Sequence, residues 1–312
     1  MAPLVNKKST FLAGNMIGAA IQLKIQLGLV SENLRDALEI VDAAILQNAE
    51  VIVLPEFFTS GIAINECMFE VPRMNRELAV IDTISSVARK AGVKIAGSIL
   101  VHDGRDCHNR MVLIDGTDNI KFHDKDIPTQ FENAYYCDGD RFRTFDGFGL
   151  AMCWEMLRGK TIRELDEDAQ VILGSTCWWS LPIGSTNEEL AIYNQDLNAN
   201  MPNKFAEISG LPIIHSSTVG KYMTKRSLKN DIEIEREYIG TTKIVDGTGK
   251  TLGDLKSKES SGMVICEIVP GKKKMTNEDF WLYDLRQEYM EAWEAENKLG
   301  KMRYEENIRR MN

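Results

Sequence analysis

The chain has 312 residues, of which 44% are hydrophobic and 27% are charged. These proportions are typical of a globular protein with a sizeable core. The formal net charge is −9 at pH 7, and an acidic surface repels phosphate backbones, which excludes nucleic acid as an expected partner. No apolar run approaches the roughly 18 residues of a membrane-spanning helix, so we expect no membrane segment.

The cysteines show neither C-x-x-C spacing nor the density of a disulfide scaffold. The segment from Met1 to Gly18 lacks the long apolar stretch of a secretory signal. We therefore expect reduced thiols in a cytoplasmic protein. The six cysteines are Cys67, Cys107, Cys137, Cys153, Cys177 and Cys266.

Predicted strands and helices alternate through the first part of the chain. Apolar runs predict strands, and apolar residues three or four positions apart predict helices. Ser31 is a candidate N-cap for the first helix. The strand at 51–54 is almost wholly apolar, as in strands covered on both faces. By these rules the strands lie at residues 17–25, 51–54, 93–100 and 111–114, and the helices at 31–48 and 75–90.

The alternation continues to residue 270 without a linker or an internal repeat. This pattern predicts one α/β domain over residues 1–270. A helical extension over residues 271–312 carries an aromatic stripe from Asp279 onward, which should pack on the body or on a partner subunit. The later strands are predicted at 150–152, 171–173, 211–214, 243–245 and 263–269, and a helix at 187–209 is interrupted at Pro202.

Four polar residues in this frame could carry chemistry. Glu56 follows an apolar strand and Pro55, and a carboxylate in that setting should have a raised pKa, which suits a proton acceptor. Cys153 ends a strand, where reacting groups collect in open α/β folds. Lys125 and Glu132 lie in a polar segment. Each residue alone also fits an ordinary role, because strand-end cysteines are usually packed and surface charges are usually solvated.

Taken in order, these segments resemble the nitrilase superfamily of carbon–nitrogen hydrolases. The resemblance rests on Glu56 after a strand and a proline, on Lys-x-x-Pro-Thr-x-x-Glu at 125–132, and on Cys-Trp-Glu at 153–155. It covers about residues 15 to 270. Further matching positions are Gly139 and Asp140, residues 172–175 with Trp178, and residues 205–214.

The resemblance implies an α/β fold of the four-layer αββα sandwich type and a homodimer or larger homo-oligomer. It also implies cleavage of a small-molecule amide or nitrile through a thioester on Cys153, without a metal or an organic cofactor. Glu56 would be the general base, while Lys125 and the backbone N–H of Trp154 would stabilise negative charge on the substrate. Glu132 would hold Lys125 and orient the substrate.

The branch of the superfamily stays open. The connection from Asp140 to Cys153 is shorter than in true nitrilases, and residues 156–158 do not continue their cysteine motif. The sequence therefore favours an amide substrate and a nitrile substrate about equally. N-carbamoyl hydrolysis and acyl transfer use the same thioester chemistry, and a catalytically silent binding or assembly protein could share the scaffold.

Aromatic residues are concentrated in the segments expected near the cysteine. Tyr136, Trp178 and Trp179 predict an aromatic-walled pocket for a small, uncharged or weakly polar acyl group. Ordinary core packing explains them equally well. His102, Cys107 and His108 fit no structural zinc spacing, so no metal site is expected.

Overall fold

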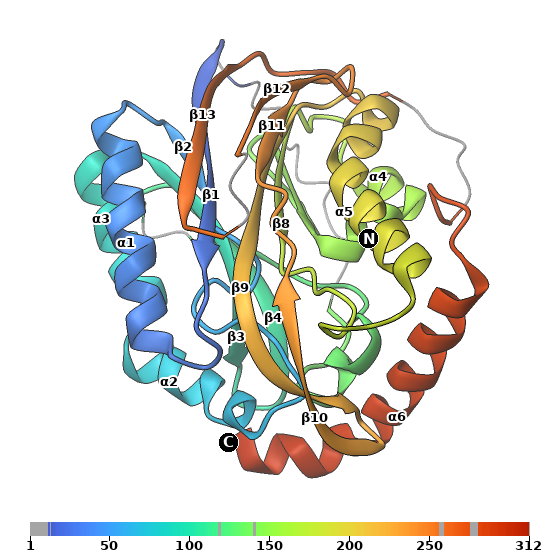
Figure 1. Ribbon diagram of the computed structural model, residues 1–312. Helices are drawn as coiled ribbons and strands as arrows, with labels where there is room; N and C mark the ends of the chain where they lie inside the picture. Colours follow the sequence, from blue (N-terminus) through green and yellow to red (C-terminus); the bar gives the residue numbers. More distant parts are fainter. Residues whose placement is uncertain are drawn as a thin grey trace, which may run out of the picture.

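The structure is a computed structural model that describes residues 12, 14–117, 120–139, 142–255, 259–274 and 280–311. Its main sheet is continuous but folds into two halves that face each other, with helices on both outer sides (Figure 1). The layers run helix, sheet, sheet, helix, so the predicted αββα sandwich is confirmed. Asp140 and Asp279, named above, lie outside the described residues.

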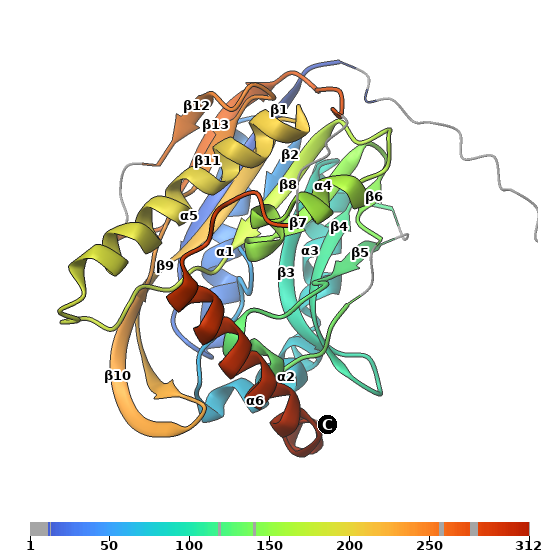
Figure 2. The same cartoon turned by 90° about the vertical axis from the view of Figure 1, so that its right-hand side faces the viewer.

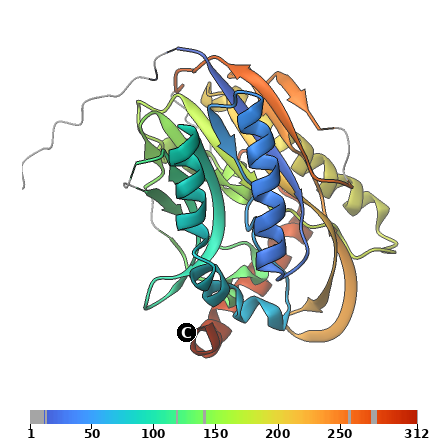
Figure 3. The same ribbon diagram turned by 90° about the vertical axis from the view of Figure 1, so that its left-hand side faces the viewer.

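The first half of the sheet comes mainly from the N-terminal part of the chain. Its strands are β1 (Met16–Lys24), β2 (Val51–Val53), β3 (Lys94–His102), β4 (Cys107–Ile114), β5 (Lys121–Asp124) and β13 (Gly262–Ile268). Its helices are α1 (Val30–Leu46), α2 (Val71–Glu77), α3 (Val80–Ala91) and the 3-10 helix η1 (Glu66–Phe69). β1, β2 and β3 are parallel, and α1 and α3 lie side by side on their outer face (Figure 3).

The second half carries the cysteine strand and continues into a long hairpin. Its strands are β6 (Thr144–Phe145), β7 (Phe148–Met152), β8 (Val171–Thr176), β9 (Ile213–Ser227), β10 (Asn230–Tyr238), β11 (Lys243–Val245) and β12 (Thr251–Asp254). Its helices are η2 (Gln130–Ala134), η3 (Cys153–Leu157), α4 (Gly159–Glu164), α5 (Glu188–Ser209) and α6 (Gln287–Met311). β7, β8 and β9 are parallel, and α4 and α5 cover their outer face (Figure 2).

An apolar layer holds the two halves together. Ala20 and Val53 of the first half meet Leu150, Leu173 and Ile214 of the second half, and all five are fully buried. β1 and β9 join the halves by a short parallel pairing. Burial of this kind contributes on the order of 25 cal/mol per Å² of apolar surface, so the layer is a major stabilising contact.

Three local predictions were wrong. The helix predicted at 75–90 is interrupted between α2 and α3 by Ala79, whose φ is 47°. Ser31 does not cap α1, because its hydroxyl donates to Glu32 instead. Pro202 does not interrupt α5, which runs from Glu188 to Ser209 with the proline ring buried; tertiary packing there outweighs the missing N–H donor.

The C-terminal helix α6 packs on the body of its own chain. Gly300 lies against Asn133 and Ala134 of η2, so tightly that an added Cβ would come within 2.9 Å of the Ala134 nitrogen. Asn307 Nδ2 donates to the Ala134 carbonyl at 2.8 Å, and Asn297 Nδ2 donates to the Pro128 carbonyl at 3.2 Å. α6 therefore supports the segment that contains Glu132. Within the described ranges, no helix is long and apolar enough to cross a membrane.

Candidate active site

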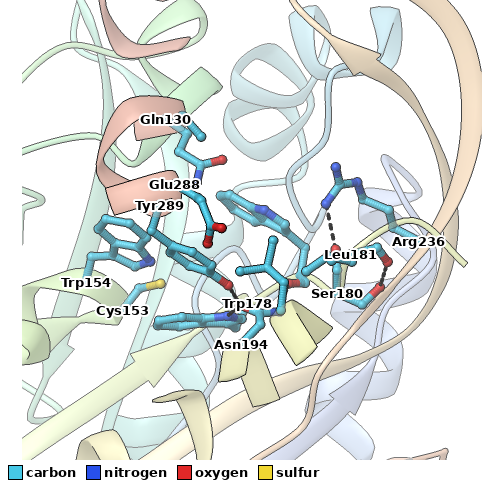
Figure 4. Close-up of a pocket in the computed structure, with 13 residues that line it drawn as sticks. Gln130, Cys153, Trp154, Trp178, Ser180, Leu181, Asn194, Arg236, Glu288 and Tyr289 are labelled. Atoms are coloured by element: carbon cyan, nitrogen blue, oxygen red, sulfur yellow. Dashed lines mark hydrogen bonds between the residues drawn. The ribbon is translucent and has the colours of Figure 1, made fainter. Parts of the chain in front are cut away.

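Cys153 lies directly after the buried strand β7, as the first residue of η3. Its φ is 50°, a left-handed conformation that non-glycine residues rarely adopt and that costs on the order of 1–3 kcal/mol. The turn is held by Glu155, whose Oε2 accepts a hydrogen bond from the Met152 N–H at 2.8 Å. The strained turn directs the sulfur out of the strand and toward a cavity (Figure 4).

Glu56 lies in the segment that follows β2, and its side chain is fully buried. Its Oε1 accepts hydrogen bonds from Lys125 Nζ at 2.9 Å and from Asn109 Nδ2 at 2.8 Å. Its Oε2 accepts one from the Cys177 N–H at 2.9 Å. These donors come from different strands and loops, so the fold fixes the orientation of the carboxylate.

Lys125 connects two buried carboxylates. Its Nζ donates to Glu56 and to Glu132 Oε2, both at 2.9 Å, and all three side chains are fully buried. Glu132 is anchored in turn, because its Oε2 accepts the Thr129 N–H at 2.7 Å and the Tyr136 hydroxyl. A buried ammonium with two carboxylate partners is held in one position and keeps its charge.

The charges in this cluster act on one another. Burial raises the pKa of Glu56, only partly offset by Lys125. Burial alone would lower the pKa of Lys125, but Glu132 and Glu56 outweigh it and hold that pKa well above its usual value. Burial and then Glu56 raise the pKa of Cys153 well above that of a free thiol. The resting sulfur is therefore a neutral thiol beside a carboxylate that can accept its proton.

A cavity of about 170 Å³ opens beside the thiol. Figure 4 shows Cys153 on one side of it, with Trp154, Trp178 and Tyr289 close by. The stacked pairs Trp154–Trp178 and Trp154–Tyr289 have ring centroids 6.1 and 6.3 Å apart. The lining residues are Gln130, Cys153, Trp154, Trp178, Trp179, Ser180, Leu181, Leu190, Asn194, Arg236, Glu288, Tyr289 and Ala292.

Comparison with known proteins decides the family. The family model for carbon–nitrogen hydrolase matches residues 19–274. This chain belongs to the carbon–nitrogen hydrolase family.

Individual relatives are more distant. A protein named nitrilase from Pyrococcus abyssi is 28% identical over 154 residues, which span 47% of this chain and 59% of that protein. A carbon–nitrogen hydrolase from Helicobacter pylori G27 has a TM-score of 0.66 at 18% identity, covering 81% of this chain and 89% of its own. A double mutant of the amidase from Nesterenkonia sp. AN1, in complex with acrylamide, has a TM-score of 0.62 at 17% identity. The match covers 93% of this chain and 100% of the amidase chain.

The structure brings most of the residues predicted for this hydrolase site together. Glu56, Lys125 and Glu132 form one hydrogen-bonded chain, and Cys153 is near enough to feel their charges: burial and then Glu56 raise its pKa, while Lys125 opposes the rise. Trp154, Trp178 and Trp179 line the cavity. Tyr136 is placed differently: it is fully buried, its hydroxyl donates to Glu132, and it is not among the described lining residues.

Other residues of the site were not identified from the sequence. Asn194 of α5 accepts hydrogen bonds from Trp178 Nε1 at 2.7 Å and from the Tyr289 hydroxyl, so it ties the segment that follows β8 to α6. Asn109 fixes Glu56 from β4, and Arg236 enters the cavity wall from β10. Only chain folding brings these elements together, and no local motif marks them. In the part of the chain that the structure describes, no cluster of three or more His, Cys, Asp or Glu residues could hold a metal ion.

A second buried ionic cluster supports the cysteine turn from behind. Glu155 Oε1 accepts hydrogen bonds from His123 Nε2 at 2.9 Å and from the Asp126 N–H at 3.0 Å, and Arg143 Nη1 lies 3.4 Å away. Burial alone would raise the pKa of Glu155, but His123 and Arg143 outweigh it and lower that pKa well below normal. Glu155 therefore stays ionised and keeps hold of the strained turn at Cys153.

We expect Glu155→Ala to lower the free energy of unfolding by about 3–5 kcal/mol, because removing one partner leaves buried charges uncompensated. Urea titration followed by circular dichroism measures this change. The matched control is Glu167→Ala, whose side chain is 73% exposed in its pair with Lys273; it should cost less than about 1 kcal/mol. Equal losses in the two variants would contradict a supporting role for Glu155.

Proposed function

We propose that this carbon–nitrogen hydrolase cleaves a small amide to a carboxylic acid and ammonia through a thioester on Cys153. The observation that carries the proposal is the position of Lys125 between Glu56 and Glu132, close to a neutral thiol that lines a cavity. This arrangement combines a nucleophile, a proton acceptor and a fixed positive charge around one reacting carbon.

In the first step the sulfur of Cys153 attacks the amide carbon while its proton moves to Glu56. The C=O electron pair moves onto oxygen, and Lys125 together with the Trp154 N–H stabilises that negative charge. When the carbonyl reforms, the C–N bond breaks and nitrogen takes the proton from Glu56, so ammonia leaves. The acyl group now remains on sulfur as a thioester.

In the second step water attacks the thioester and gives its proton to Glu56. The C–S bond breaks, the acid leaves, and the proton returns to sulfur, which restores the neutral thiol. Glu56 thus accepts and returns one proton in each half-reaction, and its raised pKa suits both roles. Glu132 keeps Lys125 charged and in place throughout.

Nitrile hydrolysis is the second candidate, because the Pyrococcus abyssi relative is named a nitrilase. The same sulfur would attack the nitrile carbon, and negative charge would develop on nitrogen instead of oxygen. The matching amidase structures support the amide as the first candidate.

The proposal is tested by measuring ammonia release from matched aliphatic amides, nitriles and N-carbamoyl compounds. We expect turnover of amides that exceeds turnover of the corresponding nitriles. Release from nitriles or N-carbamoyl compounds alone would contradict the proposed substrate class. Repeating the assay with an added amine and analysing the products separates hydrolysis from acyl transfer.

A further inference from the structure

One arginine in the cavity wall has no acidic partner. Within the described chain, Arg236 differs in this respect from the other buried or half-buried arginines. Its Nη1 donates to the Ser180 carbonyl at 2.6 Å, and the charged group that acts on it is another cation, Arg226. The arginines that do pair with a carboxylate are Arg110, Arg143, Arg158 and Arg286.

Strand geometry aims this side chain inward. β10 alternates, with Ile234, Arg236 and Tyr238 on one face and glutamates on the other. Tyr238 is fully buried, which identifies the inward face. The backbone carbonyl of Glu237 accepts a hydrogen bond from the Ser180 N–H at 2.8 Å, and this bond fixes the loop at Ser180, which faces the cavity. Arg236 therefore occupies an inward position that usually holds an apolar residue.

Arg236 lies across the cavity from the nucleophile. Figure 4 shows its guanidinium and the sulfur of Cys153 on opposite sides of the labelled residues. Arg236 also lines an adjoining cavity of about 210 Å³, which includes Lys225 and Arg226. Lys225 is paired with Asp231 at 2.7 Å and Arg226 is exposed, so Arg236 is the cation of this end that is both partly buried and without an acidic partner in the described structure.

Two glutamates also line these cavities, but neither neutralises Arg236. Glu288 is 65% exposed and lies 3.9 Å from Arg286. Glu296 Oε2 accepts the Leu228 N–H at 3.1 Å. Both belong to α6, and neither forms an ion pair with Arg236 in the described structure. A partly buried cation without a counterion is costly, and an anion supplied by a ligand would remove that cost.

We propose that the substrate is a monoamide of a dicarboxylic acid, with its amide at Cys153 and its free carboxylate bound by Arg236. A guanidinium offers two parallel N–H donors that match the two oxygens of a carboxylate. The inference rests on the proposed amide hydrolysis and deepens it. It also replaces the uncharged acyl group that the aromatic residues alone suggest.

The test compares each acidic monoamide with the neutral amide of the same chain length. Succinamic, glutaramic and adipamic acid are paired with butanamide, pentanamide and hexanamide, and kcat/KM is measured for each. The wild type should prefer the best acidic substrate by about 10- to 100-fold, the usual size of a hydrogen bond to a charged group. Arg236→Gln should abolish this preference, by lowering kcat/KM for the acidic amides far more than for the neutral amides.

Two further variants separate recognition from folding. Arg236→Lys keeps the charge and should restore part of the preference. Arg226→Gln removes an exposed neighbouring cation and should leave most of it. A wild type that turns over neutral amides as well as acidic ones, or an Arg236→Gln variant that loses both equally, would overturn the inference while leaving amide hydrolysis intact.

A binding measurement covers the case in which no amide of either kind is turned over. Such a lack of turnover would contradict the proposed function. Binding of a carboxylate by Arg236 would then be tested by thermal unfolding with added glutarate. Glutarate should raise the Tm of the wild type but not of Arg236→Gln, while pentanamide should have no comparable effect. Equal shifts in the two proteins, or no shift in either, would overturn carboxylate binding by Arg236.

Discussion

Cys153→Ala should reduce amide turnover to the uncatalysed rate. The substitution removes the sulfur that would form the thioester, while Lys125 Nζ keeps its hydrogen bond to Glu56. Cys177, whose N–H donates to Glu56, should not take over, because it is fully buried and is not among the described residues that line the cavity. Ammonia release under substrate saturation measures the effect.

The matched control is Cys107→Ala. Cys107 is also a fully buried cysteine, but it lies in β4. Its backbone N–H donates to the Tyr304 hydroxyl and not to the carboxylate of Glu56. Its removal should leave kcat/KM within about threefold of wild type, with a modest loss of stability for a small core truncation. If Cys153→Ala retained full activity on any compound that the wild type cleaves, the thioester mechanism would be wrong.

Glu56→Gln should lower kcat by about 10²- to 10⁴-fold, the range lost with a general base. The amide has nearly the shape of the carboxylate but cannot accept the thiol proton. Burial raises the pKa of Glu56, and the base form is the active one. Wild-type kcat/KM should therefore fall as pH drops through a value above the ordinary 4.5 of a glutamate.

A pH–rate profile checks the second half of this prediction. The acid limb should be present in the wild type and absent from the residual activity of Glu56→Gln. Glu50→Gln, a change at an exposed glutamate that accepts the Ile17 N–H, should leave the profile unchanged. An acid limb that persists in Glu56→Gln would assign the titration to another group.

The candidate catalytic residues could be predicted only as an ordered set, because each one alone also fits an ordinary role. Glu56 comes after an apolar strand and a proline, and Cys153 ends another apolar strand, so both lie at strand ends, where reacting groups collect in open α/β folds. Lys125 has no such local pattern, and only the resemblance of residues 125–132 to the nitrilase superfamily indicates it. Its role depends on two carboxylates from other elements, which no single segment reveals.

The cavity residues from β10, α5 and α6 could not be predicted, for a physical reason. Arg236 lies in β10, where glutamates alternate with Ile234, Arg236 and Tyr238, and this alternation does not reveal that one face borders the cavity. Asn194 and Tyr289 belong to α5 and α6, which are far apart in sequence and meet only in the folded chain. The opposite error occurred for Tyr136, whose aromatic ring suggested a pocket wall although its hydroxyl bonds to Glu132.

The element order was easier to predict than the element lengths. Short apolar strands such as β2 and β8 stand out because both faces are covered. β9 extends to Ser227, well beyond the predicted end at residue 214, because its outer part pairs with β10 rather than with the core. That extension lacks an apolar run, yet it places Arg236 at the site.

Activation of Cys153 by its surroundings can be measured by mapping the alkylation of the six cysteines with 2-chloroacetamide, a reactive amide analogue. Solvent exposure alone would favour alkylation of the half-buried cysteines Cys67, Cys137 and Cys266. Cys153 is only 1% exposed, and burial raises its pKa. We expect peptide mass spectrometry to find the first and saturable modification on Cys153, and we expect Glu56→Gln to slow this modification selectively. Modification of the half-buried cysteines first, with Cys153 unmodified or insensitive to Glu56→Gln, would contradict this activation.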